Sequence, residues 1–136
     1  MKFLLLFFFV IFLYADKITV INGLYPYIDI QLLQTYAYTA KLQSSEDMQR
    51  HKYTFVLLSK LKNIYCPNST KIKFVSYNNN SVTFTLEEIL KNNIAFVFKQ
   101  NDKFLLEKGP AEIIYIKNKN PLKELCTIRK MICIDE

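Results

Sequence analysis

Apolar and polar residues alternate along much of this chain, with the period of two that is typical of half-buried β-strands. Residues 36–42 show it clearly, because apolar or aromatic side chains occupy every second position there. The same pattern predicts strands over residues 17–22, 36–42, 71–77, 81–84, 94–99, 104–106, 112–116 and 125–134. Most of the chain after residue 16 is therefore expected to be strand.

Two segments have helical spacing instead. Apolar residues recur three and four positions apart over 57–65, which predicts an amphipathic helix that ends before Pro67. Thr85 and Glu88 have the spacing of a capping box, which predicts a second short helix ending near residues 92–93. Residues 28–33 are interpreted as a turn or short helix, and the polar segment 43–52 as a loop. Strands with two short helices indicate an α+β domain.

The N-terminal fifteen residues follow a different pattern. Lys2 precedes an unbroken apolar run over 3–14, and Ala15 stands where the chain turns polar. This order predicts a secretory signal peptide, residues 1–15, cleaved after Ala15. A retained N-terminal anchor is the alternative, although the run is shorter than the roughly 20 residues that a transmembrane helix needs. Residues 16–136 then form a single domain, and no membrane span is expected after cleavage.

The chain is basic, with a formal net charge of +6, and the charge is mostly lysine. The lysines are scattered and interleaved with acids, whereas nucleic-acid-binding proteins more often show an arginine-rich stripe with aromatic residues placed for stacking. We therefore expect a solvated surface and no nucleic-acid partner, with a weak attraction to anionic membranes as the alternative.

Three cysteines, Cys66, Cys126 and Cys133, would enter an oxidising compartment. Cys126 and Cys133 are seven residues apart on one predicted strand, so they face opposite sides and cannot pair with each other. Cys66 could pair with either of them, or the thiols could stay free and buried. No Cys-x-x-Cys or zinc-ligand spacing occurs, so zinc and thioredoxin-like chemistry are not expected.

A catalytic constellation is not apparent. His51 is the only histidine, and it stands beside Arg50 in the polar segment. A solvent-exposed loop histidine is the favoured interpretation, and Arg50 and His51 are the candidates if a cofactor is bound. The adjacent carboxylates Glu87 and Glu88 do not converge on a substrate and are better explained by helix capping. No glycine-rich phosphate loop is possible with two glycines. We predict no catalytic residue and no metal ligand.

The order of segments resembles the oxidoreductase molybdopterin-binding domain of sulfite-oxidase-like enzymes. In that family a segment of the form F-x-G-V-P-L-x-x-L-L leads to a strand, and a closing segment has the form G-P-x-R. The counterparts here are residues 53–61 (YTFVLLSKL), 71–77, 84–90, 95–105 and 109–115, where Gly109-Pro110 opens the last. The resemblance implies a mostly β, mixed-sheet and barrel-like domain with two short helices, and a molybdopterin cofactor in the enzymes.

Three departures from the family pattern bear on function. The family ligates molybdenum through a cysteine upstream of the first segment, but no cysteine precedes Cys66 here. Phe55 replaces the glycine of that segment, and Glu112 replaces the arginine of G-P-x-R. The resemblance therefore implies a small periplasmic protein without a cofactor, with a binding or accessory role toward a protein or small molecule. A periplasmic redox enzyme binding molybdopterin or a small substrate, and an envelope interaction protein with an aromatic and lysine-rich surface, are the alternatives.

Overall fold

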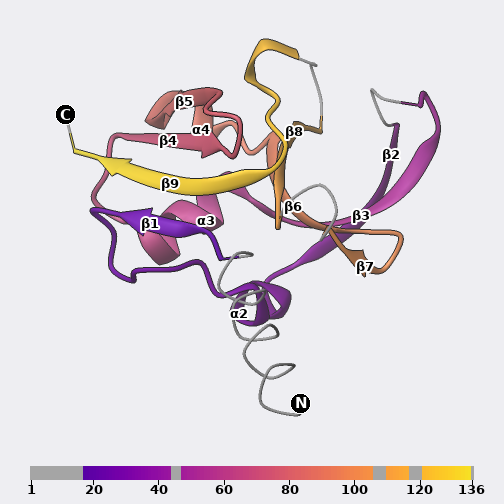
Figure 1. Cartoon of the computed structure of the whole chain (residues 1–136), viewed down its shortest axis with the longest axis horizontal. Coiled ribbons are helices and arrows are strands. Elements are labelled where there is room, and N and C mark those ends of the chain that lie inside the picture. The colour runs from indigo at the N-terminus through magenta and orange to yellow at the C-terminus, as the bar shows by residue number, and fades with distance from the viewer. Residues whose placement is uncertain (1–16, 44–46, 106–109, 117–120, 136) are drawn as a thin grey trace, which may run out of the picture.

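The computed structural model describes residues 17–43, 47–105, 110–116 and 121–135. The first of two β-sheets, sheet A, has the strand order β1-β9-β4-β5 (Figure 1). β1 and β9 are parallel, and β4 is antiparallel to both of its neighbours. The bounds are Thr19–Ile21 for β1, Lys71–Ser76 for β4, Ser81–Thr85 for β5 and Ile128–Ile134 for β9.

The second sheet, sheet B, is antiparallel and has the order β2-β3-β6-β7, with β8 also paired to β6. It forms the strongly curved right-hand part of Figure 1. The bounds are Tyr38–Gln43 for β2, Arg50–Leu57 for β3, Ile94–Gln100 for β6, Lys103–Phe104 for β7 and Glu112–Tyr115 for β8.

Three short α-helices connect or flank the strands: α2 (Ile30–Thr35), α3 (Leu58–Tyr65) and α4 (Leu86–Leu90). A 3-10 turn, η1, spans Pro121–Lys123. The side chain of Asp29 caps α2 by accepting from two backbone N–H groups of its first turn. Thr85 and Glu88 form the predicted capping box at α4, so local sequence determines where both helices begin.

The main core lies between the two sheets and α3, where large side chains such as Phe74, Phe84 and Phe96 are fully buried. α3 lies behind β9 in the view of Figure 1. A second, smaller cluster is formed by Tyr53, Phe55, Ala95, Val97 and Leu105. Because Ala95 and Val97 alternate along β6 with Phe96, this central strand is buried on both faces.

One disulfide crosslinks the domain. It joins Cys66, which follows α3, to Cys133 of β9, and the two Cα atoms are 5.6 Å apart. That separation lies within the normal range for a disulfide. Cys126 is exposed and outside the disulfide. The pairing is one of the two that the sequence left open.

The predicted α+β class with mostly β structure is confirmed, and three of its details are corrected. The domain is not a closed barrel, because among the described strands each sheet ends in edge strands that lack a second neighbour. The described residues form three short α-helices where two were predicted, since 28–33 contributes to α2. The loop predicted over 43–52 is too long at both ends, because β2 extends to Gln43 and β3 begins at Arg50. The predicted signal peptide lies outside the described residues.

Candidate functional site

The two residues predicted to bind a cofactor, Arg50 and His51, are neighbours at the start of β3. Consecutive side chains on a strand point to opposite faces, so these two do not converge on one ligand. His51 lies in register with Leu42 of β2 and is on the same face as Tyr53, whose ring it contacts edge to face at 6.3 Å between centroids. The prediction of a loop histidine is therefore wrong.

Both ring nitrogens of His51 are engaged. Nε2 lies 2.7 Å from Oδ2 of Asp47, and the amide of Asn101 lies 3.2 Å from Nδ1. This geometry fits an imidazole protonated on Nε2, which donates to Asp47 and accepts from Asn101. Hydrogen bonds from the Gln49 backbone N–H and from His51 lower the pKa of Asp47. The His51 ring therefore links the turn that contains Asp47 to the turn that contains Asn101. In this arrangement neither ring nitrogen is available as a base or as a metal ligand.

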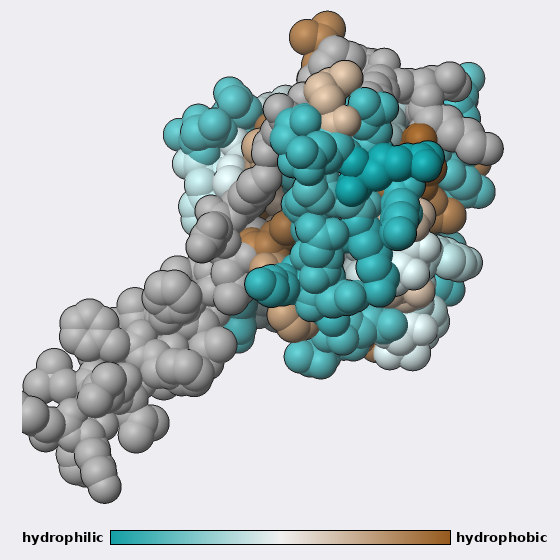
Figure 2. Space-filling model, turned by 90° about the vertical axis from the view of Figure 1, so that its right-hand side faces the viewer, coloured by the Kyte–Doolittle hydropathy of each residue, from teal (hydrophilic) through white to brown (hydrophobic). Residues whose placement is uncertain are grey.

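The side of the molecule that carries β2, β3 and β7 is largely hydrophilic (Figure 2). Charged groups here are partly paired, as in the 2.9 Å ion pair between Lys52 and Asp102. Arg50 and His51 line none of the three cavities described below. Arg50 and His51 therefore belong to the polar surface of sheet B.

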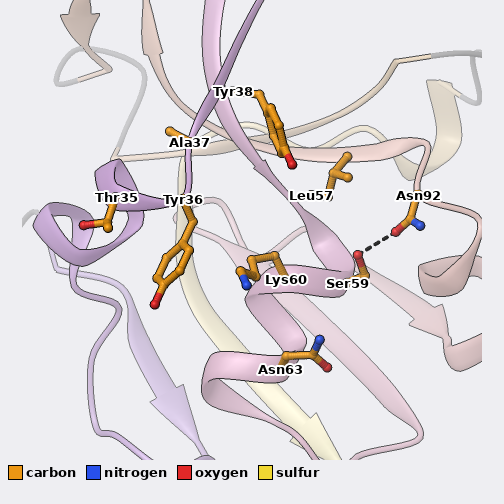
Figure 3. A pocket seen from close by; sticks show the side chains of 9 residues that line it. All are labelled: Thr35, Tyr36, Ala37, Tyr38, Leu57, Ser59, Lys60, Asn63 and Asn92. Carbon is orange, nitrogen blue, oxygen red and sulfur yellow. Dashed lines mark hydrogen bonds between the residues drawn. The ribbon is translucent and has the colours of Figure 1, made fainter.

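The largest of these cavities is an open cleft on another part of the molecule, with a volume of about 460 Å³. Three segments far apart in the sequence meet there: the connection from α2 to β2, the junction of β3 and α3, and the turn between α4 and β6. Its lining comprises Thr35, Tyr36, Ala37, Tyr38, Leu57, Ser59, Lys60, Asn63 and Asn92 (Figure 3).

Aromatic side chains and one cation determine the chemistry of the cleft. Tyr36 and Tyr38 are 42% and 61% exposed, which is high for aromatic residues. The ammonium of Lys60 lies 4.4 Å from the centroid of the Tyr36 ring, and the two side chains lie side by side in Figure 3. This cation–π contact holds the lysine head at the cleft. No acidic residue is among the nine that line it, so its electrostatic character is positive.

Polar groups from α3 and the α4–β6 turn form the opposite wall. Ser59 donates a 2.6 Å hydrogen bond to the side-chain oxygen of Asn92, which leaves the Asn92 amide nitrogen without a partner among the described residues. Asn92 adopts a positive φ of 56°, a left-handed conformation that asparagine tolerates better than most residues. The turn therefore presents an amide N–H donor beside the cleft.

The start of α3 is unusual in its local sequence. Its N-cap residue is Leu57, which has no side-chain cap, and the first turn carries Lys60 and no acid. A cation at this end opposes the helix dipole at a cost of about 0.3–1 kcal/mol. α4 has the opposite arrangement, with a capping box and acids in its first turn. Without an acid to offset Lys60, the N-terminal end of α3, which borders the cleft, is more positive than the N-terminal end of α4.

Two smaller cavities, of about 310 and 340 Å³, share Tyr27 and Asp29 as lining residues. Their central polar groups are already paired. The Tyr65 hydroxyl accepts a 2.7 Å hydrogen bond from the Asp29 backbone N–H, and the Asp29 carboxylate caps α2. Burial raises the pKa of Tyr65, so its hydroxyl stays neutral. These groups position the loop before α2.

Sequence reasoning missed the residues of the cleft. The alternating pattern places Tyr36 and Tyr38 on a predicted strand, and it does not distinguish Lys60 from the other lysines. Nothing local in the sequence shows that these segments meet, because their proximity depends on β2 pairing with β3 and on α3 following β3 directly. One local signal was available: a helix start with neither a capping side chain nor an acid.

Among the described residues, no group of three or more His, Cys, Asp or Glu side chains could hold a metal ion. No helix in that same part of the chain is both long enough and apolar enough to span a membrane.

No protein-family model matches the sequence, and no curated protein matches it.

Proposed function

We propose that this chain is an exported periplasmic protein that binds a small organic anion, without catalysing a reaction on it. The N-terminal pattern over residues 1–15 supports export. The cleft supports binding, because its volume of about 460 Å³ falls within the range of roughly 300–1,000 Å³ that is typical of small-molecule sites. The segment order that resembles the molybdopterin-binding domain supports a reduced member of that family as the scaffold.

The observation that carries the proposal is the combination of Lys60 and exposed tyrosines in a cleft without an acid. A carboxylate could accept from the Lys60 ammonium and from the amide of Asn92. The apolar part of such a ligand would lie against the rings of Tyr36 and Tyr38. A positive aromatic cleft favours an organic acid over its neutral amide by the strength of one charged hydrogen bond, about 1.5–3 kcal/mol.

A molybdenum cofactor is a poorer fit to this cleft. In the family, a cysteine thiolate ligates the metal, and none of the cleft residues is a cysteine. Cys66 and Cys133 are joined in the disulfide, and the exposed Cys126 does not line the cleft. The donor set therefore does not suit molybdenum, and a redox enzyme is the less favoured alternative. Stoichiometric molybdenum in the protein purified from its host would overturn our preference.

Calorimetric titration with small aromatic acids tests the proposed function. Benzoate and its neutral analogue benzamide are the probes, and we expect benzoate to bind at least tenfold more tightly, which corresponds to about 1.4 kcal/mol. Lys60→Gln should remove this preference for the acid. Lys103→Gln is the matched control, because it removes one positive charge from an exposed lysine on β7, outside the cleft.

Three outcomes would count against the proposal. One is that benzoate and benzamide bind equally. Another is that Lys103→Gln weakens benzoate binding as much as Lys60→Gln does, which would indicate a general effect of net charge. The third is that benzoate produces no heat and no thermal stabilisation of the folded protein.

A further inference from the structure

The outer face of sheet A, away from the main core, combines lysines and aliphatic side chains. Strand alternation places Val20, Phe74 and Met131 on the core side, where they are buried. The alternate positions point away from the core. The strands β1, β9 and β4 lie side by side in Figure 1. Their outward-facing residues are Thr19 and Ile21 on β1, Lys130, Ile132 and Ile134 on β9, and Lys71, Lys73 and Val75 on β4.

Each lysine of this outer face has an aliphatic residue directly opposite on a neighbouring strand. Lys73 pairs in register with Ile132, Lys71 pairs with Ile134, and Lys130 pairs with Val75. Cross-strand neighbours are close enough for lysine stems to lie along aliphatic side chains while the ammonium groups project outward. The three lysines and the aliphatic residues are all partly exposed.

The charge of the outer face is not balanced locally. Its described positions include no acid, and none of the three lysines has an ion-pair or hydrogen-bond partner in the described part of the chain. Some lysines elsewhere are paired: Lys52 pairs with Asp102, and the ammonium of Lys123 lies 2.6 Å from a carboxylate oxygen of Glu88. In a sheet with one solvated face, apolar residues usually point toward the core and polar residues point toward water. Aliphatic side chains are not needed on the solvated face. Unpaired cations among aliphatic groups indicate a partner that is both anionic and apolar.

We propose that the outer face of sheet A docks on the surface of an anionic lipid bilayer. Lysine is a point charge suited to phosphate headgroups, and aliphatic side chains between the lysines can enter the headgroup boundary. This inference is independent of the ligand proposed for the cleft, which Lys60 and the tyrosines line on other elements.

The same composition argues against two other occupants. A second copy of this chain, bound through the same face, would place three lysines against three lysines, which is repulsive. A folded acidic protein would more often meet tryptophan, tyrosine or arginine anchors, which dominate protein–protein interfaces. The outer positions of β1, β4 and β9 carry none of these residues, and the exposed Tyr27 lies only at the edge of the sheet, where it pairs with Thr19.

Vesicle co-sedimentation of the purified protein tests the proposal. The vesicles contain about one-third phosphatidylglycerol in phosphatidylcholine, or phosphatidylcholine alone, at low salt and at about 0.5 M NaCl. We expect binding to the anionic vesicles at low salt only. Each surface lysine contributes about fivefold to partitioning, so Lys71→Gln/Lys73→Gln should reduce binding roughly 25-fold.

The matched control is Lys41→Gln/Lys103→Gln, which removes the same charge from exposed lysines of sheet B. It should change vesicle binding less than twofold. Ile132→Thr should weaken binding without altering charge, because it removes an apolar group from the outer face. All variants share one N-terminus, so any binding by the apolar segment 3–14 is common to them. Thermal melts establish that each variant is folded.

Equal losses in the two double variants would overturn the proposal, because binding would then follow net charge alone. Equal binding to neutral and anionic vesicles would overturn it as well. A third contradicting result is no vesicle binding by the wild-type protein together with salt-sensitive binding to soluble poly-glutamate, which would identify an acidic polypeptide as the partner instead.

Discussion

Removal of the Cys66–Cys133 disulfide is expected to destabilise the domain strongly. The crosslink spans 67 residues of sequence, so it restricts the unfolded chain over about half of its length. In the chain-entropy description, closing a loop of this size contributes about 4 kcal/mol. Small domains have a total stability of about 5–15 kcal/mol. The double substitution Cys66→Ala/Cys133→Ala should therefore leave a marginally stable protein.

Urea unfolding measures this effect. The chain has no tryptophan, so circular dichroism or the fluorescence of its nine tyrosines is the probe. The unfolding free energy should fall by about 4 kcal/mol in the double variant, and by a similar amount when the wild-type protein is reduced with dithiothreitol. Cys126→Ala is the control, because Cys126 is exposed and outside the disulfide. A loss below about 1 kcal/mol on reduction would refute the reasoning from loop closure.

Two further predictions concern polar contacts at the surface. Thr85→Ala removes the capping box with Glu88 and should lower the unfolding free energy by about 1 kcal/mol in urea titrations, whereas Thr83→Ala on the exposed side of β5 should have a smaller effect. The lowered pKa of Asp47 means that its bonds, including the one to His51, stabilise the fold above the ordinary carboxyl pKa of about 4 and are lost as pH falls through the folded value. At pH 7, Asp47→Asn should therefore unfold at a lower urea concentration than the wild-type protein, and this difference should shrink as the pH falls below the ordinary carboxyl pKa; a difference independent of pH would contradict this.

Elements with a clear local signal could be predicted from the sequence. The capping box of Thr85 and Glu88 forms as expected. The helix predicted over 57–65 is observed over Leu58–Tyr65. In each case neighbouring residues alone determine the outcome, either through a side-chain cap or through apolar spacing on one helix face. The strands predicted over 71–77 and 81–84 are observed as β4 and β5, which pair with each other.

β3 could not be predicted in this way. It begins with Arg50 and continues through four consecutive buried residues, Tyr53 to Val56, so the alternation that identifies a half-buried strand is absent. Its burial on both faces depends on pairing with β2 and β6. The cleft is a consequence of the same pairing, so the sequence pattern indicates Arg50 and His51 and gives no sign of Tyr36 and Lys60.

Backbone amide chemical shifts of the protein test the role of the cleft most directly. Titration with benzoate should shift the amides of Tyr36, Lys60, Asn63 and Asn92 together, with one affinity, and should leave His51 unchanged. The same shifts should be absent with benzamide at equal concentration. Shifts centred on His51 and its neighbours, with none at Lys60, would contradict the assignment of the cleft as the binding site.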